Sequence, residues 1–327
     1  MGNFLTTPIT DKDTHTGKGN GLEYGISAMQ GWRASMEDSH IAVVDSADFP
    51  EGCSIFAVCD GHGGKLAADF AADKMVEVFA SCMQNSRLFS DKRTPTPDQI
   101  GACMRDAYML LDTQIKAVPE VQYGSDQSGC TAISAFVTAK HIVVANSGDS
   151  RSVLAKNGNV IPMSFDHKPM NDVERRRIEK AGGIVRSNRV NGDLAVSRAL
   201  GDFTYKQRSD LKAEEQQVSA EPDIKIEAID GSEEFLVIAC DGIWDVMTNE
   251  DVCAHVRDLM NKGERDMGLI AEDVIDVCLR LGSRDNMSMV IVKFPAAKIG
   301  TGEGVAGVRA ERAKQDADAA KRDGDDD

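Results

Sequence analysis

The sequence has no excess of basic residues: 37 Lys and Arg stand against 53 Asp and Glu, a formal net charge of -16. Binding to a nucleic-acid backbone needs basic surface, so this charge argues against nucleic acid as a partner. It also opposes long-range attraction of an anionic substrate. A phosphate would therefore have to be held by a local feature, such as metal ions or a well-placed arginine.

The chain also lacks a long apolar run, since none approaches the roughly 18 residues that a membrane span needs. The eight cysteines are spread singly without a C-x-x-C pair, and the six histidines show no metal-ligand spacing. Several cysteines lie in apolar runs and no secretory leader is present. We therefore expect reduced, core-packing cysteines and a cytoplasmic protein, with membrane-associated and nuclear fractions as further expectations.

Its 327 residues and a hydrophobic content of 42% allow a sizeable core. Residues 1–20 and 298–327 lack sustained periodicity, so we expect a flexible leader and a disordered acidic tail around one folded domain of residues 21–297. The opening "MGNFLT" fits the N-myristoylation pattern, with Gly2 as acceptor and Thr6 in the hydroxyl position. A chance match in a flexible leader is the alternative. One acyl chain without a polybasic segment would bind membranes only weakly and reversibly.

Helices and strands are expected in an irregular order. The helical patterns cover residues 64–80, 96–117, 171–183, 248–260 and 271–282, with a capping box from Thr96 to Gln99. β-Branched runs predict strands over residues 130–138, 141–148, 152–158, 235–240 and 287–294. The run "VVANSGDSRSVLA" predicts a hairpin whose turn carries Asp149. Direct strand-to-strand connections favour an α+β fold, with a mainly antiparallel sheet and helices packed outside.

Carboxylates follow several of the expected core strands. "SIFAVCDGHGG" ends a strand at Asp60, and "EFLVIACDGIWD" repeats the same C-D-G turn around Asp241. A single carboxylate here is usually a turn former. A set of five at strand ends or glycine turns would repel one another if gathered, and would need a cation to ionise fully. Oxygen ligands with few histidines nearby favour Mg²⁺ or Mn²⁺ over Zn²⁺. The five are Asp60, Asp149, Asp241, Asp245 and Asp285.

The segment "GWRASMEDSH" adds a cation and two more carboxylates, Glu37 and Asp38. The guanidinium of Arg33 can grip a phosphate with two parallel hydrogen bonds. His62, two residues after Asp60, could protonate a leaving oxygen, although a histidine in a flexible surface turn is the simpler reading.

These motifs together resemble the type 2C metal-dependent serine/threonine protein phosphatases. The likeness runs through residues 21–295 without a large insertion. It implies a phosphatase catalytic domain of two packed antiparallel sheets flanked by helices on both outer faces, a four-layer αββα sandwich. The motifs that carry it are "GWRASMEDSH", "FAVCDGHGG", "SGCTA", "NSGDSR", "DHKP", "AGGIV", "VNGDLAVSRALGDF", "ACDGIWDVM" and "GSRDNMSMV".

The resemblance implies two Mn²⁺ or Mg²⁺ ions at one end of the sandwich, and a weaker third. Asp60 matches the carboxylate that bridges both ions, and Gly61 the residue whose carbonyl binds one of them. Asp241 and Asp285 match the ligands of the other ion. The resemblance also assigns Glu37 a contact through water, and Asp149, with Asp241 shared, the third site.

The family's chemistry is direct attack on phosphorus by a water held between the metals. Arg33 matches the phosphate clamp and His62 the general acid. Residues 165–190 correspond to the flap beside the cleft, from which Arg189 could meet a phosphopeptide, although an exposed arginine is usually just solvated. Phosphoprotein substrates and a monomeric state are the implied partners and assembly.

Three alternatives compete with this interpretation. Cys278 and Arg284 form the C-x5-R spacing of cysteine-dependent phosphatases, but Val277 replaces the usual histidine and Cys278 falls on an apolar helix face. The histidine-rich binuclear phosphatases share a "CDGHGG"-like opening, but their later clustered histidines are absent. A catalytically dead phosphoprotein-binding regulator is the non-enzyme alternative, and the intact carboxylate set argues against it.

Overall fold

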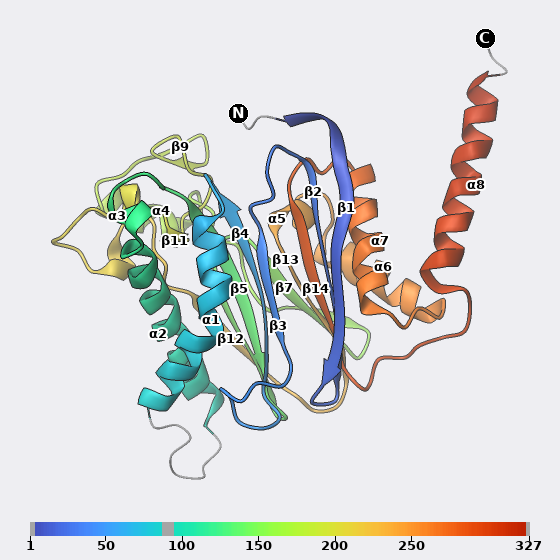
Figure 1. Ribbon diagram of the computed structural model, residues 1–327, viewed down its shortest axis with the longest axis horizontal. Coiled ribbons are helices and arrows are strands. Elements are labelled where there is room, and N and C mark those ends of the chain that lie inside the picture. The colour runs from blue at the N-terminus through green and yellow to red at the C-terminus, as the bar shows by residue number, and fades with distance from the viewer. Residues whose placement is uncertain (1–3, 87–94, 325–327) are drawn as a thin grey trace.

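Two antiparallel β-sheets lie face to face at the centre of the computed structural model, which describes residues 4–86 and 95–324 (Figure 1). The predicted α+β fold and the four-layer sandwich are confirmed. The first sheet has the order β1 (Phe4–Gly19), β2 (Leu22–Arg33), β14 (Met287–Lys293), β13 (Glu233–Ala239), β7 (Arg151–Lys156), β8 (Asn159–Pro162). The second has the order β12 (Asp223–Ala228), β6 (His141–Ser147), β5 (Gly129–Val137), β4 (Ser54–His62), β3 (Ser39–Val43), and β11 (Leu200–Gly201) pairs with β5.

Helices cover both outer faces (Figure 1). Those on the second sheet are α1 (Leu66–Asn85) and α2 (Pro97–Lys116), followed by α3 (Pro119–Gln122); those on the first are α5 (Asp241–Trp244), α6 (Asn249–Asn261) and α7 (Met267–Arg280). The predicted capping box of Thr96 and Gln99 is present at the start of α2, and Thr248 and Asp251 form a second at the start of α6. No helix within residues 4–86 and 95–324 is long and apolar enough to cross a membrane.

Within β4 the five residues "IFAVC" (55–59) are all apolar because both faces of the strand are buried. Phe56 and Val58 pack between the two sheets, whereas Ile55, Ala57 and Cys59 pack under helices α1 and α2. Side chains alternate along a strand, so one run of five residues serves two cores. Asp60 is on the same face of the strand as Phe56 and Val58, so it lies at the end of the space between the sheets.

The predicted hairpin around Asp149 is wrong in its pairing, although both strands exist. β6 pairs with β5 and β12, while β7 pairs with β13 and β8, so the turn carries the chain from one sheet to the other. A hairpin and a sheet-crossing link share the same local pattern of strand, glycine turn and strand. The partner of each strand depends on the other strands of its sheet, which are distant in the sequence, so the local pattern does not reveal it.

The expected flexible leader is also corrected. Residues from Phe4 to Gly19 form β1, an edge strand paired antiparallel with β2. An edge strand buries little of its surface, so its sequence carries only a weak apolar signal. Its many threonines nevertheless suit a strand, and Pro8 lies where the register of the ladder shifts between Phe4 and Ile9. Gly2 lies outside the described residues.

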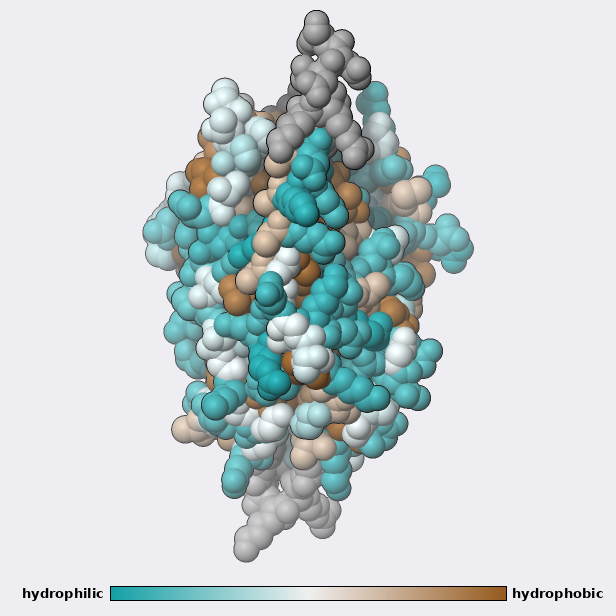
Figure 2. Space-filling model, turned by 90° about the vertical axis from the view of Figure 1, so that its right-hand side faces the viewer, coloured by the Kyte–Doolittle hydropathy of each residue, from teal (hydrophilic) through white to brown (hydrophobic). Residues whose placement is uncertain are grey.

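The expected disordered tail contains a helix, α8 (Gly304–Gly324). Its beginning is anchored on α7, where Arg312 Nη1 donates to Asp273 Oδ1 at 3.0 Å and Arg309 pairs with Glu272 and Asp276. The remainder of α8 extends away from the sandwich (Figure 1). The face of the molecule on this side is largely hydrophilic, with hydrophobic residues only in scattered spots (Figure 2). The polar composition of the tail predicted disorder, but ion pairs with α7 hold the beginning of this helix in place.

The flap predicted over residues 165–190 is a small separate unit. It contains α4 (Asp172–Lys180) and a ribbon of β9 (Val185–Arg186) and β10 (Arg189–Val190), followed by two short 3₁₀ helices at Phe203–Tyr205 and Ala213–Glu215. A local core holds it together, with Ile178, Val190 and Val218 fully buried.

Glu174 ties this flap to the segment that follows it. Its buried carboxylate accepts hydrogen bonds from Arg177 Nη1 at 2.6 Å, Arg198 Nη2 at 2.8 Å and Ser197 Oγ at 2.7 Å. Burial alone would raise its pKa, but the hydrogen bond from Arg198 and the charge of Arg177 hold the pKa of Glu174 at about 2.

We expect Glu174→Gln to destabilise the protein by about 3 kcal/mol at pH 7, because it leaves buried arginines without their counter-charge. Urea unfolding measures this difference. A carboxylate with a lowered pKa stabilises above its unfolded pKa, so the difference between the two proteins should shrink as the pH falls from about 4.3 toward 2. Glu179→Gln on the same helix, where Glu179 pairs with Arg175 at the surface, is the matched control and should change little. Equal effects of the two substitutions would contradict the prediction.

Candidate active site

The two C-D-G turns meet at one end of the sandwich. Asp60 lies opposite Thr131, two residues before the end of β4, so the strand runs on past the position where the sequence predicted its end. Asp241 begins α5 directly after Cys240. Cys240 continues the inward face of β13, as its place in the inter-sheet core shows. The two strands come from different sheets, so face-to-face packing brings the two carboxylates to the same place. Asp285 joins them from the loop before β14.

The glycines of these turns allow the backbones of other segments to come close. A Cβ at Gly61 would lie 2.3 Å from the carbonyl oxygen of Glu37, and one at Gly242 would lie 2.0 Å from that of Asn286. Any side chain at either position would push a neighbouring segment away. The repeated C-D-G pattern therefore reflects two close approaches of backbone to backbone, which gather the carboxylates of three distant segments.

One cavity of about 490 Å³ is lined by nine of the predicted site residues. The predicted residues that it brings together are up to 252 positions apart, the separation of Arg33 and Asp285. The predicted residues in its wall are Arg33, Glu37, Asp60, Gly61, His62, Asp149, Arg189, Asp241 and Asp285. Asp245, the fifth carboxylate of the sequence pattern, is exposed at the end of α5 and does not belong to this wall.

The carboxylates at the centre of the cavity are crowded and partly buried. Burial raises the pKa of Asp60 well above its ordinary value, and the negative charges of Asp38 and Asp241 raise it further. Burial likewise raises the pKa of Asp241, with the charges of Asp149 and Asp285 adding to the effect. A group of this kind is unfavourable in its ionised form unless a cation lies among the oxygens. The protein thus carries electrostatic strain that a bound cation would relieve.

Asp38 gives the clearest sign that the residues fit a metal. Both of its carboxylate oxygens are buried without a hydrogen-bond partner among the described residues, and burial raises its pKa to about 6. One ligand atom each from Asp38, Asp60 and Cys240 lies within 4.8 Å of the others. Buried oxygens without donors are costly, and hard divalent cations prefer such oxygens. The donor set is mainly carboxylate, which suits Mg²⁺ or Mn²⁺.

Asp149 is almost fully buried and forms an ion pair with Lys168 from the flap segment. Burial would lower the pKa of Lys168, but the charge and the hydrogen bond of Asp149 raise it. The lysine thus supplies a positive charge next to this carboxylate.

His62 is fixed by a residue that the sequence did not suggest. Its Nε2 lies 2.7 Å from Oδ2 of Asp202, which is buried and adopts a positive φ of 53°. Burial alone would lower the pKa of the imidazole, but the charge and the hydrogen bond of Asp202 raise it. The pair therefore favours the protonated imidazolium, the form that can donate a proton. The unusual backbone of Asp202 shows how strictly its position is set.

Two arginines border the cavity. Arg33 pairs with Asp285 through one guanidinium nitrogen, while its Nε is buried without a partner among the described residues. Arg189 is exposed and donates to the carbonyl oxygen of Asp193 within the flap. Both therefore offer donors at the mouth of an otherwise acidic cavity.

Sequence reasoning missed several residues of this site or gave them no role. Asn286 Nδ2 donates to the carbonyl oxygens of Gln30 at 2.8 Å and Ser35 at 3.0 Å, and its Oδ1 accepts from the amide of Glu37 at 3.0 Å. It fastens the Arg33 segment to the Asp285 loop. Asp38, Lys168 and Asp202 all lie within the quoted motifs, but neither periodicity nor spacing distinguishes them from ordinary turn residues.

The cysteine-based alternative does not fit the geometry. Cys278 lies on the buried face of α7, with its sulfur 3.5 Å from that of Met247. Arg284 stacks over the ring of Phe4 at 5.8 Å. Burial also raises the pKa of the Cys278 thiol to about 12, so it would not be a thiolate at neutral pH.

Comparison with known proteins agrees with this geometry. The family profile described as Protein phosphatase 2C matches residues 22–287. The chain is 41% identical to human Protein phosphatase 1A over 298 residues, covering 91% of this chain and 77% of that protein. It is 42% identical to mouse Protein phosphatase 1B over 301 residues, with coverage of 91% and 76%.

Solved structures show the same fold. A C. elegans sex determining protein superimposes with a TM-score of 0.72 at 29% identity, covering 84% of this chain and 65% of that one. A phosphatase from Toxoplasma gondii gives a TM-score of 0.73 at 24% identity, covering 88% and 97%. With its acidic cavity and these relatives, the chain belongs to the protein phosphatase 2C family of metal-dependent protein phosphatases.

Proposed function

We propose that this protein removes phosphate from phosphoserine and phosphothreonine in other proteins by direct attack of water. The observation that carries the proposal is the group of buried, mutually repelling carboxylates around Asp60, beside Arg33 and a His62–Asp202 pair. Oxygen ligands gathered in this way suit divalent cations, two at the centre and a weaker third near Asp149. When bound, such ions offset the charge of the phosphate and acidify a water molecule.

The residues of the chain would divide the remaining work. Asp60, Asp241, Asp285, the Gly61 carbonyl and, through water, Glu37 would hold the cations. Arg33, whose side chain is partly exposed in the cavity wall, would bind two phosphate oxygens through its guanidinium and orient the phosphorus for in-line attack. His62, protonated beside Asp202, would give its proton to the departing serine or threonine oxygen. Arg189 on the flap would contact the phosphopeptide.

A single-turnover experiment tests direct attack. The full-length protein, in excess over a phosphothreonine peptide and supplied with Mn²⁺, is quenched in acid and analysed by mass spectrometry. The proposal expects free phosphate and no phosphorylated protein at any time, because no protein nucleophile is involved. A phosphorylated intermediate would refute direct attack. Cys278→Ser should turn over like the wild type, since the thiol is buried outside the cavity.

Replacing Arg33 with Ala should raise KM for the phosphopeptide and lower kcat/KM about 10²-fold, since charge-assisted hydrogen bonds contribute about 1.5–3 kcal/mol each. Steady-state kinetics measures both constants. Arg33→Lys should recover only part of the loss because an ammonium cannot form two parallel hydrogen bonds. Arg284→Ala, which changes an arginine outside the cavity wall, is the control. Full recovery by lysine would refute the two-point contact.

Gly2 acylation is a separate proposal, which rests on the N-terminal sequence alone. The protein would be cytoplasmic and monomeric, with nuclear and reversible membrane-bound fractions. In cells fed an alkyne analogue of myristate, the wild type should be labelled and Gly2→Ala should not, and only the wild type should have a membrane fraction. Equal membrane fractions for the two proteins would contradict anchoring through Gly2.

A further inference from the structure

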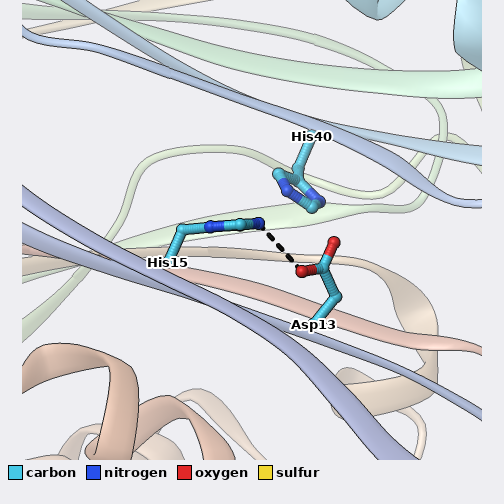
Figure 3. A group of neighbouring side chains, drawn as sticks. All are labelled: Asp13, His15 and His40. Carbon is cyan, nitrogen blue, oxygen red and sulfur yellow. Dashed lines mark ion pairs between the residues drawn. The ribbon is translucent and has the colours of Figure 1, made fainter.

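Two histidines and an aspartate converge at an edge of the sandwich, outside the cavity described above (Figure 3). Asp13 and His15 are two positions apart on β1, so their side chains share one face of the strand. His40 reaches them from β3. His15 Nε2 lies 2.8 Å from Asp13 Oδ1, and the rings of His15 and His40 are 6.3 Å apart at their centroids. One ligand atom from each of the three residues lies within 4.8 Å of the others.

The three residues lie where the edges of the two sheets face each other. β1 is the edge strand of the first sheet and β3 is the edge strand of the second. No backbone ladder joins these two strands among the described residues, because each belongs to a different sheet. Side chains alone cross the gap at this point. The function proposed above requires none of the three.

We propose that Asp13, His15 and His40 form a separate metal site for a borderline divalent transition metal such as Zn²⁺, which joins the edges of the two sheets. Imidazole nitrogen is a ligand that Zn²⁺ favours, whereas Mg²⁺ and Mn²⁺ prefer an all-oxygen set such as that around Asp60. Two histidines and one carboxylate form a common protein ligand set for Zn²⁺, with water in the fourth position.

Only small side-chain movements are required. Around a tetrahedral metal with bonds of about 2.1 Å, ligand atoms are about 3.4 Å apart. The ligand atoms of the three residues now lie within 4.8 Å of one another, so they would have to move somewhat closer. The side chains of Asp13 and His15 are 66% and 61% exposed, so both can rotate without disturbing a core. The metal would replace the present His15–Asp13 contact. The two strands are close together only in the folded protein, so metal binding should also stabilise the folded state over the unfolded one.

The test is a Zn²⁺ titration of the full-length protein in excess Mg²⁺, followed by calorimetry and by NMR of the histidine rings. The wild type should bind one more Zn²⁺ than His15→Ala or His40→Ala, or bind it at least about tenfold more tightly, since loss of even an outer partner of a ligand costs about 10–100-fold. The signals of both histidines should shift, and Zn²⁺ should raise the Tm of the wild type more than that of either variant. His141→Ala, a half-buried histidine on β6, should behave like the wild type.

Repeating the titration in Asp60→Asn separates this site from the carboxylate cavity, so failure of one assignment does not imply failure of the other. The three alanine variants are also compared by circular dichroism, which reports whether they fold. Unchanged Zn²⁺ binding in folded His15→Ala and His40→Ala would overturn the proposal. So would Zn²⁺ binding that leaves both histidine signals in place, because the residues would then form only a surface Asp–His pair.

Discussion

Replacing Asp60 with Asn is expected to lower kcat/KM for a phosphothreonine peptide by about 10³-fold or more. A bound cation stabilises the charge of the transition state by several kcal/mol, and each ~1.4 kcal/mol corresponds to a tenfold change in rate. Asp60 lies at the centre of the group, with Asp38, Asp241, Asp149 and Asp285 all close enough to affect its pKa. No other carboxylate of the cavity is therefore in a better position to hold a cation in place.

The same substitution should have an opposite effect on stability in the absence of divalent cations. Asn removes one of several crowded, buried carboxyl groups, so Asp60→Asn should melt at a higher temperature than the metal-free wild type. Added Mg²⁺ or Mn²⁺ should then raise the Tm of the wild type and have little effect on the variant. Asp48→Asn, which changes an exposed aspartate, is the matched control for both measurements. If Asp60→Asn melts at a lower temperature than the metal-free wild type, loss of folding explains its inactivity and contradicts this explanation.

Replacing His62 with Gln should lower kcat by about 10²-fold or more on a phosphothreonine peptide, the usual size of a general-acid contribution. The loss should be much smaller on an aryl phosphate, because the departing phenolate is weakly basic and needs no proton. Steady-state kinetics on the two substrates separates loss of proton donation from general damage to the site. Equal losses on both substrates would refute the role of His62 as general acid.

Asp202→Asn tests how His62 is positioned. It keeps the shape of the partner but removes the charge that lies 2.7 Å from His62 Nε2. We expect kcat to fall more on the phosphothreonine peptide than on the aryl phosphate, but by a smaller factor than in His62→Gln. The imidazole remains in place, but without the aspartate charge its protonated form is less favoured. His255→Gln, which changes another histidine paired with an aspartate outside the cavity, should leave the ratio of the two rates unchanged.

The sequence predicted most of the fold and the site because these features have local signatures. Each capping box, at Thr96 and at Thr248, is specified by four consecutive residues, and the buried run before Asp60 by a few more. The grouping of the carboxylates could be expected because each ends a core strand or a glycine turn. The family resemblance then gave each of them a role.

The features that could not be predicted depend on distant neighbours. Whether the strands flanking Asp149 pair with each other is decided by the other strands of each sheet. The strand β1 and the helix α8 are polar because only one face of each meets the rest of the protein, so composition made both segments look unstructured. Asp202 lies 140 residues from the histidine that it contacts. The convergence of His15 and His40 on Asp13 also arises only where the edges of two sheets meet.

The most direct test of the central claim is the rate of phosphate release from a phosphothreonine peptide as chelator-treated, full-length protein is titrated with Mn²⁺. If the buried carboxylates around Asp60 hold the cations that make hydrolysis possible, activity should be absent at the start, rise with added Mn²⁺ and disappear again on chelation. Mg²⁺ should also restore it. Full activity in the chelated protein, or a normal rise in Asp60→Asn, would contradict the account.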